Sequence, residues 1–125
     1  MVNGGDTFWI PDAGGGHLYV VLSEPHLDAD HVILVSITSH KSYKDQACIL
    51  ETGFHPSITR RSCVDYRRAL VYPVNRIEQL VTSRQIAPKE QIPSELLKCM
   101  RLAAPESRIS LKNLKILTDQ GLIEQ

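Results

Sequence analysis

The chain is poor in cysteine, and its few cysteines do not form pairs. Cys48, Cys63 and Cys99 are an odd number of widely spaced thiols in a chain of 125 residues. Disulfide frameworks and zinc sites need paired cysteines, often in a C-x-x-C spacing. A chain of this length can also bury enough apolar surface to fold without such a staple. The sequence therefore predicts a protein of a reducing compartment, without a disulfide framework or a structural zinc.

The chain also lacks a long apolar run and a net charge. No apolar segment approaches the ~18 residues of a membrane helix. The first six residues, Met-Val-Asn-Gly-Gly-Asp, have neither the basic nor the apolar region of a signal peptide. We therefore expect a cytoplasmic protein with no membrane partner. The 14 basic and 14 acidic side chains give a formal net charge of zero, so the overall charge favours no class of partner.

Several motifs for metal, nucleotide and acyl-transfer chemistry are absent. The glycines at residues 14–16 belong to no G-x-x-x-x-G-K-[ST] or G-x-G-x-x-G motif, and there is no G-x-S-x-G. Cys63 with His55 could form a nucleophile pair, but Cys63 stands in a predicted strand, where a free cysteine usually acts as a small core residue. No H-E-x-x-H or other short metal-ligand spacing joins the five histidines, His17, His26, His31, His40 and His55. We expect no metal and no cofactor.

The chain does contain a short apolar run at its centre. Residues 32–37 (Val-Ile-Leu-Val-Ser-Ile) are almost all apolar and mostly β-branched, which predicts a strand buried on both faces. Thr38 and Ser39 follow at once, so this strand ends in two hydroxyl groups at the edge of the core. Weaker patterns of the same kind predict strands at residues 6–10, 17–23, 47–50 and 62–71.

The last part of the chain has helical character. Residues 75–81 predict a short helix capped by Asn75, and residues 94–104 predict a helix capped by Ser94. A final helix is expected over residues 107–118, with its inward face formed by Ile109, Leu114 and Leu117 and with Leu111 as an additional candidate. Residues 82–91 are predicted to form a loop. Five short strands followed by helices indicate an α+β fold, a small antiparallel barrel capped by helices. We expect one domain over residues 1–125, with the barrel at about 5–73 and the helical part at about 75–119.

Some polar side chains suit chemistry on a phosphodiester. Metal-free RNA cleavage needs a base for the 2′-hydroxyl, an acid for the leaving 5′-oxygen, and donors for the phosphorane charge. His17 and His55 suit the proton roles, because histidine titrates near neutral pH. The hydroxyls of Thr38 and Ser39 suit the third role, as does the arginine-rich segment at residues 60–76. These residues also have ordinary explanations, as strand ends, turn residues or a solvated strand face.

Four segments, in the same order, resemble the MazF/PemK/Kid family of toxin endoribonucleases. Residues 5–10 (Gly-Asp-Thr-Phe-Trp-Ile) are similar to the family opening Gly-Asp-Ile-Val-Trp-Val. Residues 17–23 (His-Leu-Tyr-Val-Val-Leu-Ser) are similar to Arg-Pro-Ala-Leu-Val-Leu-Ser. Residues 35–39 (Val-Ser-Ile-Thr-Ser) resemble a strand that ends in Pro-Ile-Thr-Ser, and residues 63–69 (Cys-Val-Asp-Tyr-Arg-Arg-Ala) resemble Ser-Leu-Asp-Trp-Arg-Ala-Arg. The similarity covers about the first two-thirds of the chain.

The resemblance implies an SH3-like barrel that forms a homodimer and cleaves single-stranded RNA without metal, through a 2′,3′-cyclic phosphate. It also implies growth inhibition and neutralisation by an antitoxin protein. Thr38 matches the active-site threonine of the family, and His17 stands where the family has its catalytic arginine. On this hypothesis His17 is the acid or base, and His55 takes the second proton role. Thr38 and Arg60 are the other catalytic candidates: Thr38 with Ser39 binds the phosphate, and Arg60 or Arg61 offsets the charge of the transition state. Ser39, Arg61 and Lys41 are assigned to substrate binding.

Two other functions fit the same fold. The barrel could be a non-catalytic SH3-like binding module for a protein or a nucleic acid, or the helices could pack against a larger assembly. The nuclease hypothesis makes one geometric demand. His17, at the start of its strand, should lie beside Thr38, at the end of the antiparallel neighbour, with both side chains on one face.

Overall fold

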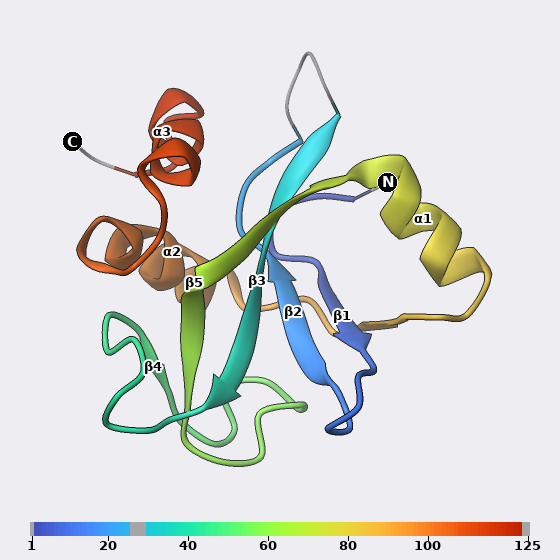
Figure 1. Cartoon of the computed structure of the whole chain (residues 1–125), viewed down its shortest axis with the longest axis horizontal. Helices are drawn as coiled ribbons and strands as arrows, with labels where there is room; N and C mark the ends of the chain where they lie inside the picture. Colours follow the sequence, from blue (N-terminus) through green and yellow to red (C-terminus); the bar gives the residue numbers. More distant parts are fainter. Residues whose placement is uncertain (1, 26–29, 124–125) are drawn as a thin grey trace.

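The structure is a computed structural model and describes residues 2–25 and 30–123; His26 and most of the expected turn at residues 24–30 lie outside it. Over the described residues, six antiparallel strands form one sheet in the order β4-β5-β3-β2-β1-β6, which curls into a half-barrel (Figure 1). The strands are β1 (Thr7–Ile10), β2 (His17–Val21), β3 (His31–Ser39), β4 (Ile49–Leu50), β5 (Ser62–Pro73) and β6 (Ala87–Lys89). The helices are α1 (Val74–Thr82), α2 (Ser94–Ala103), a 3-10 turn at Ala104–Glu106 and α3 (Leu111–Asp119). The predicted α+β class, a small antiparallel barrel with helices, is confirmed.

The central strand β3 is the spine of the sheet. Residues 32–37 are all buried, as the sequence predicted. β3 pairs with β2 on one side and with β5 on the other. Because side chains alternate along a strand, Ile33, Val35 and Ile37 enter one core, whereas Val32 and Leu34 enter a second core on the opposite face.

The helices cover the two faces of the sheet unequally. Leu97 and Met100 of α2 and Leu117 of α3 close the larger core. On the opposite face, α1 supplies Val74 and Ile77 to the smaller core, and Figure 1 shows α1 and the α2–α3 pair on opposite sides of the sheet. The smaller core lies at one end of its face, so the other end of that face carries polar side chains without a helical cover.

A wide bulge in β5 separates these two ends. Leu34 pairs with Leu70 and Ser36 pairs with Asp65, so residues 66–69 of β5 lie opposite Val35 alone. Extra residues in one strand bend it and turn its side chains. Tyr66 is fully buried within the bulge, and its hydroxyl donates a hydrogen bond of 2.6 Å to the backbone carbonyl of Met100. This bond ties the bulge to α2.

The segment predicted as a loop at residues 82–91 contains a strand, so that prediction was wrong. β6 pairs with β1, and Pro88 lies opposite Phe8. The three residues of β6 are all exposed. A short exposed edge strand with a proline leaves no apolar alternation in the sequence.

Helix boundaries differ slightly from the predicted ones. Asn75 and Ser94 lie inside α1 and α2, whose N-caps are Pro73 and Pro93. The predicted inward position of Leu111 is wrong, because this side chain is 83% exposed. Ser110 caps α3 and accepts a hydrogen bond from the Asn113 N–H. No helix within the described residues has the length and apolar character needed to cross a membrane.

The Tyr66–Met100 bond gives the first prediction. Tyr66→Phe should lower the free energy of unfolding by about 1–2 kcal/mol, because it leaves a buried carbonyl without its donor. Chemical denaturation measures this change. Tyr43→Phe is the matched control, since Tyr43 is 72% exposed, and should change stability by less than about 0.5 kcal/mol. Equal stability of Tyr66→Phe and the parent protein would contradict the proposed anchoring of the bulge.

Candidate functional site

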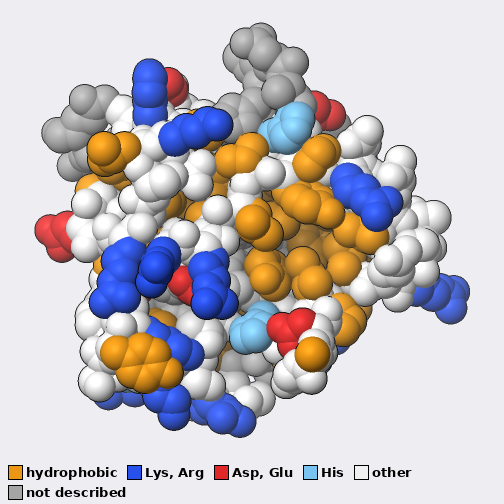
Figure 2. All heavy atoms as spheres, in the orientation of Figure 1, with side chains coloured by type: hydrophobic (Ala, Val, Ile, Leu, Met, Phe, Trp, Pro, Cys, Tyr) orange, Lys and Arg blue, Asp and Glu red, His pale blue; other side chains and the backbone are white. Residues whose placement is uncertain are grey.

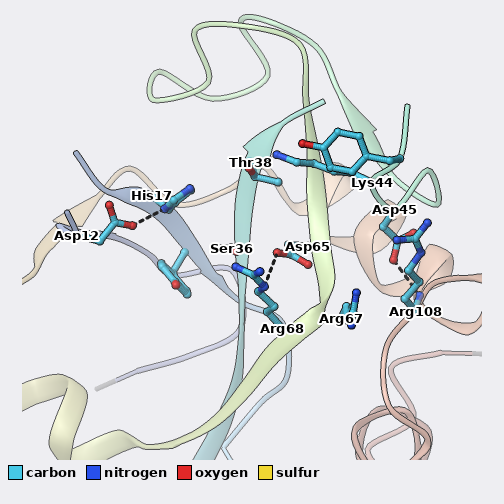
Figure 3. A pocket seen from close by; sticks show the side chains of 12 residues that line it. Asp12, His17, Ser36, Thr38, Lys44, Asp45, Asp65, Arg67, Arg68 and Arg108 are labelled. Atoms are coloured by element: carbon cyan, nitrogen blue, oxygen red, sulfur yellow. Dashed lines mark hydrogen bonds and ion pairs between the residues drawn. The ribbon is translucent and has the colours of Figure 1, made fainter. Parts of the chain in front are cut away.

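The polar end of the α1-bearing face forms a cavity that contains two of the site residues predicted from the sequence, His17 and Thr38. Tyr19 of β2 lies opposite Ser36 of β3, and Ser36 lies opposite Asp65 of β5. One residue beyond the Leu18–Ile37 pair, the same register places His17 opposite Thr38. His17 and Thr38 both line a cavity of about 520 Å³ (Figure 3). They therefore lie on one face, as the nuclease hypothesis demands.

His17 is held by a carboxylate from the preceding hairpin. Its Nδ1 lies 2.8 Å from Asp12 Oδ2. A carboxylate only accepts hydrogen bonds, so Nδ1 carries the proton, and Nε2 forms no hydrogen bond to any residue that the structure describes. In Figure 3 a dashed line joins Asp12 to His17, and the opposite side of the ring is turned toward Thr38. A histidine oriented by a carboxylate with its second nitrogen free is arranged for proton transfer.

The hairpin that carries Asp12 is shaped by glycine. The Gly14 N–H donates to Asp12 Oδ1 at 2.8 Å. This bond and then the His17 hydrogen bond lower the pKa of Asp12 below its ordinary value, so the carboxylate stays ionised well into acidic solution. Gly16 has φ +124°, and a Cβ there would lie 2.7 Å from Trp9 Nε1. Only glycine therefore fits at the residue before His17.

Lys44, in the loop between β3 and β4, contacts Thr38, the second residue of the His17–Thr38 pair. Lys44 Nζ donates to Thr38 Oγ1 at 3.0 Å and to the Ser39 carbonyl at 3.1 Å. An ammonium group has three N–H donors, so one remains for a ligand. The side-chain amide of Gln46 fixes the loop by donating to the carbonyls of Lys41 and Lys44 at 3.0 and 2.6 Å.

Asp45 is a structural member of the cavity wall. This carboxylate is buried and accepts hydrogen bonds from the N–H groups of Ala47 at 3.1 Å and Arg108 at 2.8 Å. It joins the β3–β4 loop to the segment before α3. Because both of its oxygens are occupied by backbone donors, we assign it no chemical role.

Three arginines complete the cavity, and two of them have no anionic partner among the residues that the structure describes. Arg68 Nε lies 3.9 Å from Asp65 Oδ2. The side chains of Arg67 and Arg108 form no ion pair or hydrogen bond within the described chain. Figure 2 shows Lys and Arg side chains gathered on this face. The acids of the cavity are each engaged by a donor, so these two guanidinium groups leave the cavity attractive to an anion.

A second cavity, of about 300 Å³, shares His17 and Thr38 with the first. It lies at the end of the half-barrel and is lined by Trp9, Ser39 and Arg60 among others. Two of the residues predicted from sequence, Ser39 and Arg60, thus adjoin His17 and Thr38 from this side. The two cavities meet at the His17–Thr38 pair.

The remaining predicted site residues lie elsewhere. His55 is buried, its Nε2 donates to the Glu90 carbonyl, and its Nδ1 accepts from the Ser57 N–H at 3.0 Å. Both ring nitrogens are therefore used in holding the segment that precedes β5. Arg61 Nε faces Glu51 Oε1 at 3.5 Å on the surface. Lys41 is exposed and lines neither cavity.

Four functional candidates were not selected from the sequence: Asp12, Lys44, Asp65 and Arg108. Arg67 was included only as part of the arginine-rich segment at residues 60–76. Asp12 follows a proline and precedes three glycines, a pattern typical of a side-chain-capped turn, which is a usable local signal. Lys41 and Lys44 lie in the same loop, so the sequence does not show which of them lines the cavity. Arg108 comes from the segment before α3, far away in the sequence. Only the tertiary structure distinguishes Lys44 and Arg108.

Two of the three cysteines are buried, and the described residues contain no cluster of metal ligands. Cys48 and Cys63 are buried and free, and Cys99 is exposed and free. Burial raises the pKa of the Cys48 thiol to about 11 and also raises that of Cys63, which disfavours the reactive thiolate. Among residues 2–25 and 30–123, no group of three or more His, Cys, Asp and Glu side chains is placed to hold a metal ion.

No protein-family model matches this chain, and no curated protein matches it either.

The Asp12–His17 bond gives the second prediction. His17→Ala should raise the pKa of Asp12 toward its ordinary value, but not fully, because the Gly14 N–H remains. A carboxyl group whose pKa is lowered by folding stabilises the folded state at every pH above its ordinary pKa. This stabilisation is lost as the pH falls through the lowered pKa, so it is present at neutral pH. An NMR titration of the Asp12 carboxyl carbon measures the shift. His31→Ala, at the far end of β3, is the control; an Asp12 pKa that stays unchanged in His17→Ala would show that the bond is not formed in solution.

Proposed function

We propose that the protein is a metal-independent endoribonuclease that cleaves single-stranded RNA at the cavity around His17 and Thr38. The observation that carries the proposal is the meeting of two polar pairs, Asp12–His17 and Thr38–Lys44, on one wall of that cavity. The first pair suits proton transfer and the second suits the binding of a phosphate oxygen. The unpaired guanidinium groups of Arg67 and Arg108 supply charge on the opposite side.

The first half of the reaction uses His17 as the base. Its free Nε2 accepts the proton of the 2′-hydroxyl while the 2′-oxygen attacks the adjacent phosphorus. Asp12, hydrogen-bonded to Nδ1, stabilises the imidazolium that forms and keeps the ring in position, as a carboxylate does for a general-base histidine elsewhere.

The second half uses Lys44. Its third N–H faces the phosphate, offsets the charge of the phosphorane, and gives a proton to the leaving 5′-oxygen. The bond from phosphorus to the 5′-oxygen breaks as the bond to the 2′-oxygen forms. The products are a 2′,3′-cyclic phosphate and a 5′-hydroxyl. The proton taken up by His17 returns to Lys44 through solvent, so the enzyme regains its starting state.

The charge of the cavity suits a polyanion although the chain as a whole is neutral. Asp12, Asp45 and Asp65 each accept a hydrogen bond or lie beside a cation. Lys44, Arg67 and Arg108 are then free to contact phosphates, whose binding by lysine and arginine dominates the affinity of proteins for nucleic acids. Single-stranded RNA suits the site better than a duplex, because a duplex does not present unstacked nucleotides.

The resemblance to MazF/PemK/Kid proteins extends this proposal to the cell. The nuclease would be a cytoplasmic toxin whose subunit is an SH3-like barrel. It would act as a homodimer and be inhibited by an antitoxin protein. A chain that binds single-stranded RNA but does not cleave it would instead be the non-catalytic binding module. The following experiments separate these two functions.

Purified protein should cleave single-stranded RNA equally well with and without EDTA. His17→Ala should reduce kcat by about 10²–10⁴-fold, the usual contribution of a general base. The rate of cleavage of a fluorescent oligoribonucleotide measures both effects. His31→Ala should retain full activity, because His31 lies at the opposite end of β3, across from Pro73. Intact RNA with the parent protein, or equal rates for His17→Ala and the parent, would sink the nuclease proposal.

The two lysines of the β3–β4 loop give a matched pair. Lys44→Ala should reduce kcat by about 10²–10³-fold, because it removes a donor from the developing charge. Lys41→Ala should change the rate by less than about threefold, because an exposed charge outside the cavity is screened by solvent. Single-turnover cleavage at saturating protein measures the two variants. Equal losses in both variants would mean that the loop acts only through its general charge.

A further inference from the structure

An apolar hollow of about 190 Å³ lies between the sheet and α1, beside the polar cavity. It is walled by Phe8, Tyr19, Leu34, Leu70 and Tyr72, together with Ile77 of α1. Figure 2 shows this hollow open to solvent and surrounded by hydrophobic side chains. Leu70 remains 46% exposed at its rim. An open apolar site beside polar binding groups is a common place for a ligand.

The hollow adjoins the proposed active site at one side chain. Tyr19 lines both the hollow and the polar cavity. His17 and Tyr19 are alternate residues of β2 on the same face, roughly 6–7 Å apart along the strand. An occupant of the hollow therefore lies one side chain away from the group that would take the 2′-proton.

The chemistry of the two compartments together limits what the occupant can be. The polar cavity offers Lys44 and two guanidinium groups without a partner among the described residues. The hollow offers aliphatic side chains and the rings of Phe8 and two tyrosines. A ligand that fills both must carry an anion beside a flat apolar group. A nucleotide has this composition, and single-stranded nucleic acids are commonly held by stacking of their bases on aromatic side chains.

We propose that the hollow is a nucleobase subsite, which takes the base of a nucleotide adjacent to the cleaved phosphate. The inference rests on the proposed nuclease function and specifies its substrate contact. The hollow is smaller than the ~300–1,000 Å³ of most small-molecule sites, so it accepts one ring system. Tyr19 would contact the base on the side that faces the polar cavity.

Two adjacent residues of β5 give a matched test. Leu70 lines the hollow, whereas Val71 does not, and the two are 46% and 41% exposed. Leu70→Glu places a charge at the rim of the hollow, and Val71→Glu places the same charge on the opposite face of the strand. The probe is a labelled, uncleavable single-stranded oligonucleotide with 2′-O-methyl riboses, and fluorescence anisotropy measures its Kd. Leu70→Glu should raise the Kd about tenfold, the loss expected for one stacked base, and Val71→Glu should leave it within about twofold.

Single abasic replacements along the oligonucleotide identify the base. One position should weaken binding to the parent protein about tenfold and leave binding to Leu70→Glu unchanged, because that variant has already lost the contact. Equal binding by Leu70→Glu and the parent, additive losses, or no oligonucleotide binding at all would overturn the subsite. Base-dependent binding without cleavage by the parent protein would support the subsite and reject the nuclease. A Leu70→Glu variant that loses only self-association would assign the hollow to a protein contact and overturn the proposal.

Discussion

The pairing register of β3 with β2 and β5 is the constraint on which the site depends. Side chains alternate between the two faces of a strand, so a slip of one residue would move every side chain to the other face. The register is secured by burial, since the apolar side chains of residues 32–35 and of Ile37 enter the two cores on opposite faces of the sheet. The same register carries His17 and Thr38 to one face beyond the last apolar pair. The fold and the candidate chemistry therefore share a single cause.

The division of that face into two ends follows from α1 and the bulge. α1 covers Val32 and Leu34, and on this face the apolar pairing of β3 with β5 ends at the Leu34–Leu70 pair, where the bulge begins. Beyond the bulge, the strands present Ser36, Thr38 and Asp65 to the cavity. A charged cavity and an apolar hollow therefore lie side by side on one sheet. We infer that this juxtaposition fits a nucleotide, with its phosphate in the cavity and its base in the hollow.

Much of the fold was predictable because β3 and the helical segments have clear local patterns, and four further strands have weaker patterns of the same kind. β6 was not, since an exposed three-residue edge with Pro88 has no apolar period. In the site, Thr38 was selected because it ends the central strand and matches the threonine of the resembled family. His17 was selected because its imidazole suits proton transfer and stands where that family has its arginine. Lys44 and Arg108 were missed because their positions depend on a loop held by Gln46 and on the packing of the segment before α3. Arg67 was not distinguished within the arginine-rich segment, because its position depends on the β5 bulge. His55 was chosen for its chemistry, but burial commits both of its nitrogens to backbone groups.

The most direct test of the account is the identity of the RNA ends that the protein produces. Mass spectrometry of a defined single-stranded RNA, incubated with the protein in EDTA, reports both ends. The proposed roles of His17 and Lys44 predict a 2′,3′-cyclic phosphate and a 5′-hydroxyl, and no cleavage where the attacking ribose is replaced by 2′-deoxyribose. Products with a 3′-hydroxyl and a 5′-phosphate, or cleavage at the 2′-deoxy position, would contradict attack by the 2′-oxygen and with it the proposed role of His17.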